Sequence, residues 1–284
     1  MEEKLIEKVM QEVMKRVGAS STEAPGVPAA PTTPAVPAAP ATPEPNAIVA
    51  PVSDDLIQVT EFVGASMGDT QGIVIANLDS TIHELMEFDK KYRSIGVIGG
   101  RTGAGPQLMA ADDAVKATNT EIIRVEMPRD TKGGAGHGNL IIFGAEDVSD
   151  ARRAVEVTLD VLPKYFGDVY ANEQGYTENQ YSARASTCLN KALNAPIGKA
   201  FGLILGAPAV VGMLMIDTAV KAADVEVVGY GSPSHGTSMT NEVFIWVTGD
   251  SGAVRQAVIA GREVGNKLLG AWGEQPQSLS TPYI

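Results

Sequence analysis

The stretch SIGVIGGRTGAGPQLMAADDAVKATNTEII, residues 94–123, occurs a second time in outline as AFGLILGAPAVVGMLMIDTAVKAADVEVV, residues 200–228. Each copy reads as an apolar strand, a turn with Gly or Pro, a helix containing Asp-x-Ala-Val-Lys-Ala and a β-branched strand. The similarity extends over residues 94–162 and 200–269 almost without gaps. A duplicated small domain places two similar but unequal units in one chain, which favours a ring or a tile over a catalyst.

Both copies continue with a glycine-rich loop that contains a His-Gly pair, a hydrophobic strand and a closing helix, and a strand-and-helix block precedes each copy. In the first block, the expected elements are strands at 56–68 and 72–76 and a helix at 80–86. Asp79 or Ser80 is expected to cap that helix. Short connections favour antiparallel sheets with helices on one side. The sequence therefore predicts an α+β fold with two domains, residues 55–165 and 166–284.

The composition limits the classes of function. The net charge of -12 argues against a nucleic-acid partner, because phosphate binding needs clustered Lys and Arg. The single cysteine, Cys188, excludes a disulfide within the chain and fits a reducing compartment. The sequence shows no secretory signal and no apolar stretch of about 18 residues. We therefore expect a cytoplasmic protein without a lipid-membrane partner.

Residues 1–17 read as a short amphipathic helix with apolar residues at spacings of three and four. The stripe residues that we expect to dock onto cargo are Leu5, Ile6, Val9, Met10, Val13 and Met14. A helix of this length is marginal alone in water. Its stripe therefore needs a partner, either the body of this chain or another protein.

Residues 18–54 are rich in Pro and Ala, and a proline stands at every third position from Pro25 to Pro43. Three residues per turn is the period of polyproline II, so this segment predicts an extended linker that forms no core. A proline-rich ligand of a recognition domain is the alternative, but its charged anchors are missing. A helix on a stiff linker indicates a docking peptide.

The repeated pattern resembles the bacterial microcompartment shell domain. The residues that carry the resemblance are the two Asp-x-Ala-Val-Lys-Ala helices, the strand EVVGY at 226–230 with the glycine loop after it, and Gly249-Asp250 before the closing helix. The block before each copy is similar to that of the circularly permuted form of this domain. The resemblance implies two tandem ferredoxin-like domains and a homotrimer that forms a pseudohexamer. The docking helix and linker are similar to those of propanediol-utilisation shell proteins, and the ethanol-utilisation type stays open.

In that family, the lysine of the repeated helix lies at the tile edge. Its stem packs flat there, and its ammonium group meets backbone carbonyls of the next tile. The resemblance assigns this tile-edge contact to Lys116 and Lys221. The alternative is a pair of ordinary solvated helix lysines.

The resemblance also implies that the two glycine loops line pores. The candidate pore residues are Lys132, Gly133, Gly134, Gly136 and His137 in the first loop, and Ser232, Ser234, His235, Gly236, Thr237 and Ser238 in the second. Glycine exposes backbone N–H groups, and Ser and Thr offer hydroxyls. Such a lining suits small polar neutral metabolites such as propanediol or glycerol. Mobile loops without a transport role are the alternative.

The sequence contains no pattern typical of a catalytic or metal site. A ring of His137 or His235 around a three-fold axis would bring imidazoles together, but no further ligand stands at a recognised spacing. The nucleophile-elbow, Cys-x-x-Cys and His-Glu-x-x-His motifs are all missing. We therefore expect no catalytic residue, no cofactor and no bound metal.

These observations predict a structural shell protein of a bacterial microcompartment, not an enzyme. Its expected partners are other shell proteins, the encapsulated enzymes that its N-terminal helix would bind, and small metabolites in transit. The rival hypothesis is a soluble trimeric small-molecule-binding or regulatory protein whose glycine loops hold an anionic metabolite.

Overall fold

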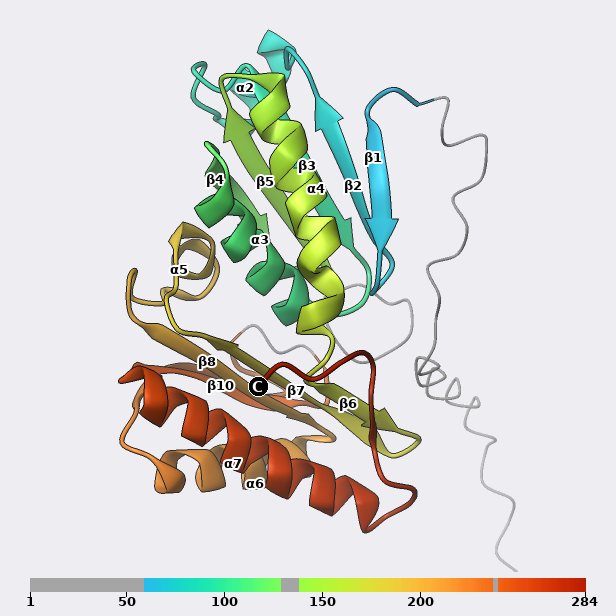
Figure 1. Ribbon diagram of the computed structural model, residues 1–284, viewed down its shortest axis with the longest axis vertical. Coiled ribbons are helices and arrows are strands. Elements are labelled where there is room, and N and C mark those ends of the chain that lie inside the picture. Colours follow the sequence, from blue (N-terminus) through green and yellow to red (C-terminus); the bar gives the residue numbers. More distant parts are fainter. Residues whose placement is uncertain (1–58, 129–137, 237–239) are drawn as a thin grey trace, which may run out of the picture. The chain divides into compact units, whose positions relative to one another are not determined.

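Two antiparallel sheets, one from each repeat, form the framework of the protein (Figure 1). The computed structural model describes residues 59–128, 138–236 and 240–284, which all belong to one unit of the chain, residues 39–284. The expected docking helix and linker lie outside the described residues.

The first repeat forms a five-stranded sheet, the first sheet, with the order β1-β2-β3-β5-β4. Its strands are β1 (Phe62–Ser66), β2 (Thr70–Ile75), β3 (Ser94–Gly100), β4 (Glu121–Glu126) and β5 (Asn139–Ala145). Its helices are α2 (Ser80–Met86), α3 (Gly105–Ala117) and α4 (Val148–Tyr165). The strand expected at 56–68 is shorter than predicted, because β1 begins only at Phe62 after a turn at Thr60 and Glu61.

The second repeat forms a six-stranded sheet, the second sheet, with the order β11-β6-β7-β8-β10-β9. Its strands are β6 (Val169–Asn172), β7 (Gly175–Ser182), β8 (Ala200–Ala207), β9 (Glu226–Gly231), β10 (Val243–Gly249) and β11 (Gln277–Ser278). Its helices are α5 (Thr187–Leu193), α6 (Ala209–Ala222) and α7 (Ser251–Gly270). The predicted α+β class with antiparallel sheets is confirmed.

The two repeats are equivalent down to strand register. Val97 pairs with Ile142 in the first sheet, and Leu203 pairs with Trp246 at the same place in the second. The short helices α2 and α5 have the same length, with Asp79 as the N-cap of α2.

Glycines allow the helices to pack closely on one face of each sheet, which we call the helix face. A Cβ on Gly96 would lie 2.7 Å from the backbone oxygen of Ala151 on α4. A Cβ on Gly202 would lie 2.8 Å from Val258 on α7. These approaches are shorter than a real Cβ tolerates, so the glycines let α4 lie close to the first sheet and α7 close to the second. Helices α3 and α6 pack beside them, α3 against α4 and α6 against α7.

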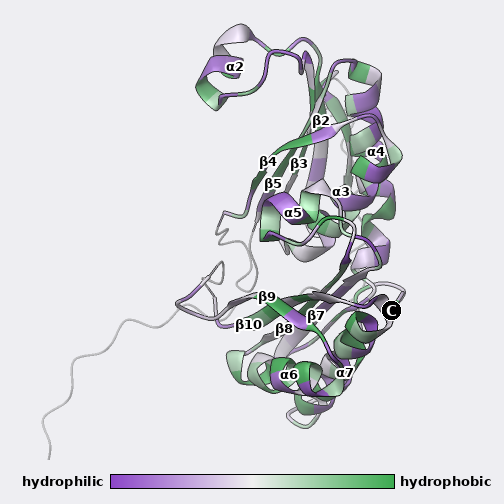
Figure 2. Ribbon diagram, turned by 90° about the vertical axis from the view of Figure 1, so that its left-hand side faces the viewer, coloured by the Kyte–Doolittle hydropathy of each residue, from purple (hydrophilic) through white to green (hydrophobic). Residues whose placement is uncertain are grey.

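The second sheet is covered on its other face as well, by α3 and α5 (Figure 1, Figure 2). We call this face the junction face. Phe201 and Leu203 point into the junction core that they share with Leu108 of α3 and Leu189 of α5. Alternate residues such as Ile204 point to the helix face, so β8 is buried on both sides. Among the described residues, no helix is long and apolar enough to cross a membrane.

Candidate functional site

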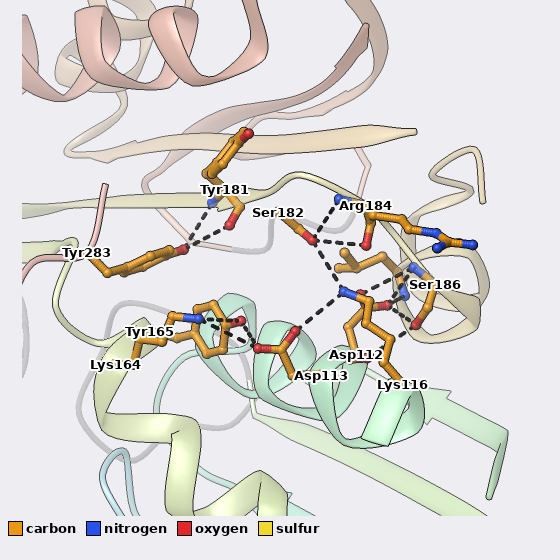
Figure 3. A network of polar contacts seen from close by, with 11 residues as sticks. Asp112, Asp113, Lys116, Lys164, Tyr165, Tyr181, Ser182, Arg184, Ser186 and Tyr283 are labelled. Carbon is orange, nitrogen blue, oxygen red and sulfur yellow. Dashed lines mark hydrogen bonds and ion pairs between the residues drawn. The ribbon is translucent and has the colours of Figure 1, made fainter. Parts of the chain in front are cut away.

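The contact between the repeats centres on Asp112, a fully buried carboxylate of α3 (Figure 3). The backbone N–H of Ser186 donates to Asp112 Oδ1 at 3.0 Å, its hydroxyl donates to the same oxygen at 2.5 Å, and the N–H of Leu189 donates at 3.2 Å. Ser186 is the N-cap of α5, but its own side chain makes no capping hydrogen bond. Asp112 therefore caps α5 from the other repeat, where the helix dipole also favours a negative charge.

The two predicted edge lysines lie in different surroundings. The ammonium nitrogen of Lys116 lies 2.8 Å from Asp112 Oδ2 and 3.4 Å from the Ser182 hydroxyl of the second repeat, and its side chain is 31% exposed. Lys221 forms an ion pair with Asp217 at 2.7 Å on α6, and its side chain is 72% exposed. The two lysines thus differ in exposure, because the second repeat covers Lys116 and nothing in the described part of the chain covers Lys221 to the same extent.

A tyrosine network continues the junction toward the C-terminus (Figure 3). The Tyr165 hydroxyl donates to Asp113 of α3, and Tyr283 packs edge-on against the Tyr165 ring at 5.2 Å between centroids. Burial, and then the hydrogen bond to Asp113, raises the pKa of Tyr165 far above its usual value. Tyr165 therefore stays neutral and serves as a structural donor at any ordinary pH.

A small cavity of about 40 Å³ lies at the same junction, between the start of α3 and the second sheet. Its polar lining is Tyr176, Glu178 and Glu242, and its apolar lining includes Leu108 and Leu203. The Tyr176 hydroxyl donates to Glu242 at 2.5 Å. Among the described residues, Glu178 Oε1 has no hydrogen-bond partner.

Glu178 is the most perturbed carboxyl group of this cavity. Burial, and to a smaller extent the charge of Glu242, raises the pKa of Glu178 to about 8. Burial likewise raises the pKa of Tyr176 well above its ordinary value. A Cβ on Gly105 would lie 1.8 Å from Glu178 Oε1, so a side chain at the first residue of α3 would force the Glu178 carboxyl group to move. The cavity therefore presents a neutral Glu178 at neutral pH.

The second pore loop is described only in part. Ser232 and His235 exchange backbone hydrogen bonds of 3.0 and 2.9 Å, and the His235 ring stacks on Tyr230 at 4.4 Å. Gly236 has φ +70°, which glycine adopts readily. Exposed Ser234 lies within the turn between these two bonded residues. The turn therefore holds its hydroxyl and imidazole groups at the surface.

The remaining candidate pore residues lie outside the described residues. They are Lys132, Gly133, Gly134, Gly136, His137, Thr237 and Ser238. The candidate docking residues Leu5, Ile6, Val9, Met10, Val13 and Met14 lie outside them too. Within the described ranges, no three His, Cys, Asp or Glu side chains come together as a metal site.

Sequence reasoning missed the junction residues Asp112, Glu178 and Glu242. Asp112 belongs to the repeated helix motif, so the sequence marks the position as one of interest. The matched residue Asp217 is nevertheless exposed. The motif therefore does not reveal which copy becomes buried. Glu178 lies in a polar strand, YTENQYS, that reads as a solvated edge, although Thr177 to Gln180 are buried.

The comparisons with known proteins agree with this duplicated architecture. The chain matches the BMC domain family at residues 94–173 and 200–272. It is 61% identical over 226 residues to the bacterial microcompartment shell protein PduB of Citrobacter freundii, covering 80% of this chain and 84% of that protein. It is 52% identical over 280 residues to PduB of Salmonella typhimurium strain LT2, covering 99% of this chain and 98% of that protein.

Two solved structures are similar over most of the chain. One is a trimeric bacterial microcompartment shell protein PduB, with a TM-score of 0.76, 54% identity and coverage of 80% of this chain and 100% of that one. The other is EtuB from Clostridium kluyveri, with a TM-score of 0.77, 54% identity and coverage of 79% and 99%.

Proposed function

This chain belongs to the BMC domain family of bacterial microcompartment shell proteins, and from that premise we propose that three copies close one pseudohexameric tile. The protein is a structural component of the shell and not an enzyme. Each chain contributes two unequal repeats, so three chains supply the six positions of the ring.

The observation that carries this proposal is the equivalence of the repeats, together with a trimeric relative. Both repeats have the same central register, and a relative described as trimeric is 54% identical over its whole length. At that identity, we expect this chain to assemble as its trimeric relative does. A ring of six similar domains is suited to serve as one building block of a shell.

The compartment type follows from the named relatives. The similarity to PduB at 52% to 61% identity supports propanediol utilisation. An ethanol-utilisation compartment is the second candidate, because EtuB from Clostridium kluyveri matches at 54% identity. Growth of a deletion strain on each substrate separates them: loss of the compartment during growth on propanediol supports the first candidate.

Passage of small polar metabolites is part of the proposal. Ser232, Ser234 and His235 are held in a hydrogen-bonded turn and offer hydroxyl and imidazole groups. These groups replace water around a neutral diol without selecting for charge. The second-repeat loop is accordingly assigned to a pore lining, together with the first-repeat loop that carries His137.

The N-terminal segment is proposed to join the shell to the enzyme core. Its apolar stripe fits a groove or a second short helix on an encapsulated enzyme, and the proline-rich linker gives it reach. The alternative is that the stripe packs on the body of the chain.

Electron microscopy of the purified protein at high concentration tests the tile. Two-dimensional sheets with hexagonal spacing are expected, whereas a soluble small-molecule-binding trimer has no self-complementary edge. Lys221→Ala is expected to keep the trimer and lose the sheets, because Lys221 is proposed to bridge neighbouring tiles. Dispersed particles of the wild-type protein at every concentration would refute the proposal.

A further inference from the structure

The corresponding strands β1 and β6 differ in what lies beside them. In the second sheet, β6 pairs with β11, where Gln277 pairs with Ala171, and the N–H of Leu279 donates to a β6 carbonyl oxygen at 2.9 Å. In the first sheet, β1 pairs only with β2 among the described strands, and it is the outermost strand (Figure 1). An outermost strand offers backbone N–H and C=O groups to a further strand.

The order of elements along the chain explains this difference. Helix α7 is followed by residues 271–284, which turn back and place β11 beside β6. Helix α4 ends at Tyr165, and the chain enters β6 at Val169. The first repeat therefore has no segment after its closing helix that could turn back along β1.

A groove of about 360 Å³ lies beside this outermost strand, and we call it the edge groove. Residues 63–65 of β1 form one wall. The α4 wall consists of Arg153, Glu156, Leu159 and Asp160. A Cβ on Gly64 would lie 3.3 Å from Leu159, so the glycine and the leucine together shape an apolar floor.

The second repeat holds an extended segment at the corresponding place. By the helix register of the two repeats, Arg262 of α7 takes the position of Leu159. Arg262 pairs with Asp168 and donates to the backbone oxygen of Ile284 at 3.3 Å, so ionic groups hold the C-terminal segment there. The apolar floor of the edge groove favours an apolar side chain of its occupant instead.

The charges of the α4 wall define the occupant further. Arg153 pairs with Glu156 at 3.5 Å, and Asp160 is exposed one turn further along the helix, so the wall has one negative charge in excess. The segment that precedes β1 in the chain carries Asp54 and Asp55. Like charges would face each other if that segment filled the groove. A segment with Lys or Arg has the complementary charge.

We propose that the edge groove binds an extended, basic segment of another protein as a further strand beside β1. Main-chain hydrogen bonds to β1 supply affinity, and an apolar side chain covers Leu159. A Lys or Arg two residues away lies on the same face of the added strand and reaches Glu156 and Asp160. The groove belongs to a single repeat, so the proposal does not depend on the tile.

Fluorescence anisotropy of a labelled synthetic peptide, TVTKTVTKT, with the full-length protein at about 150 mM salt tests the proposal. The valines and lysines of this peptide share one face of a strand. We expect saturable binding that Asp160→Lys weakens about 10-fold, because an attraction becomes a repulsion. Glu156→Lys replaces Asp160→Lys if the latter fails a thermal-unfolding check.

Two controls separate binding at the edge groove from general attraction to an acidic protein. Glu263→Lys reverses the charge at the corresponding exposed position of α7, where β6 is already paired, and should leave the affinity within about twofold of wild type. The peptide TVPKTVPKT keeps the charges but lacks two backbone donors, so it should not bind. Hydrogen exchange should slow in β1, and not in β6, when TVTKTVTKT binds.

Several results would overturn the proposal. Equal binding of the two peptides, or equal effects of Asp160→Lys and Glu263→Lys, would mean that the net charge of -12 alone attracts the peptide. Absence of saturable binding would show that the edge groove takes no such strand. Slow exchange of β1 without any peptide would show that this chain or a second copy already covers the strand.

Discussion

Asp112 of the first repeat accepts a 2.5 Å hydrogen bond from the Ser186 hydroxyl of the second repeat. One repeat therefore completes the first turn of a helix in the other, and the matched Asp217 has no such task within the chain. The two repeats therefore use the matched aspartates differently: Asp112 binds the other repeat, and Asp217 pairs with Lys221 of its own helix.

Asp112→Asn should lower the free energy of unfolding by about 3 kcal/mol, because it removes the charge that the α5 N–H groups and Lys116 share in a buried site. Denaturant unfolding of the purified protein measures the change. Asp217→Asn is the matched control and should stay within ~0.5 kcal/mol of wild type. Equal effects of the two substitutions would contradict the capping role.

Gly105→Ala should destabilise the protein by about 3 kcal/mol, since the added methyl group would overlap Glu178 Oε1. Gly99→Ala is the control: its Cβ would meet nothing closer than 3.7 Å and should cost less than ~1 kcal/mol. The double variant Gly105→Ala/Glu178→Ala should recover part of the loss in thermal unfolding. Additive losses would show that the overlap is not the cause.

The stability of wild-type protein should fall as pH rises from 4.5 to 8. The pKa of Glu178 is raised from 4.5 to about 8, so the folded state holds a proton that the unfolded state releases in this window. Glu178→Gln should flatten this dependence, while Glu84→Gln on the exposed face of α2 should not. Denaturant midpoints across the pH range give the slopes. An unchanged slope in Glu178→Gln would mean that another group is responsible.

Deletion of residues 1–17 should leave the tile intact and detach the shell from the enzyme core, because only the docking stripe is lost. Co-purification of the enzymes with isolated shells measures the attachment. Val9→Asp/Val13→Asp, with the segment kept, should have the same effect. A truncated protein that no longer trimerises would place the helix on the body of the chain instead.

Much of the fold was predictable from the sequence, because the repeated pattern fixes local elements by periodicity. The helix at 80–86 is confirmed, and so are the apolar strands that open the two repeated stretches, which are β3 and β8. The N-cap of α2 is Asp79, one of the two residues proposed. Ser186, the N-cap of α5, takes the place of Asp79 in the second repeat.

The polar interior was not predictable, since burial at the junction depends on the other repeat. Glu178 has the sequence context of a solvated strand and is buried by α3 and β8 only after folding. Leu108 and Met213 have similar local sequences, yet one is buried and the other exposed. No local signal distinguishes them, because the burial of Leu108 depends on its contact with the second repeat of the chain.

The native mass of the wild-type protein in solution tests the central claim most directly. Three copies of the 29.7 kDa chain should give a single species of about 89 kDa. A monomer or dimer at every concentration would contradict the account, because two or four repeats cannot fill the six positions of the ring.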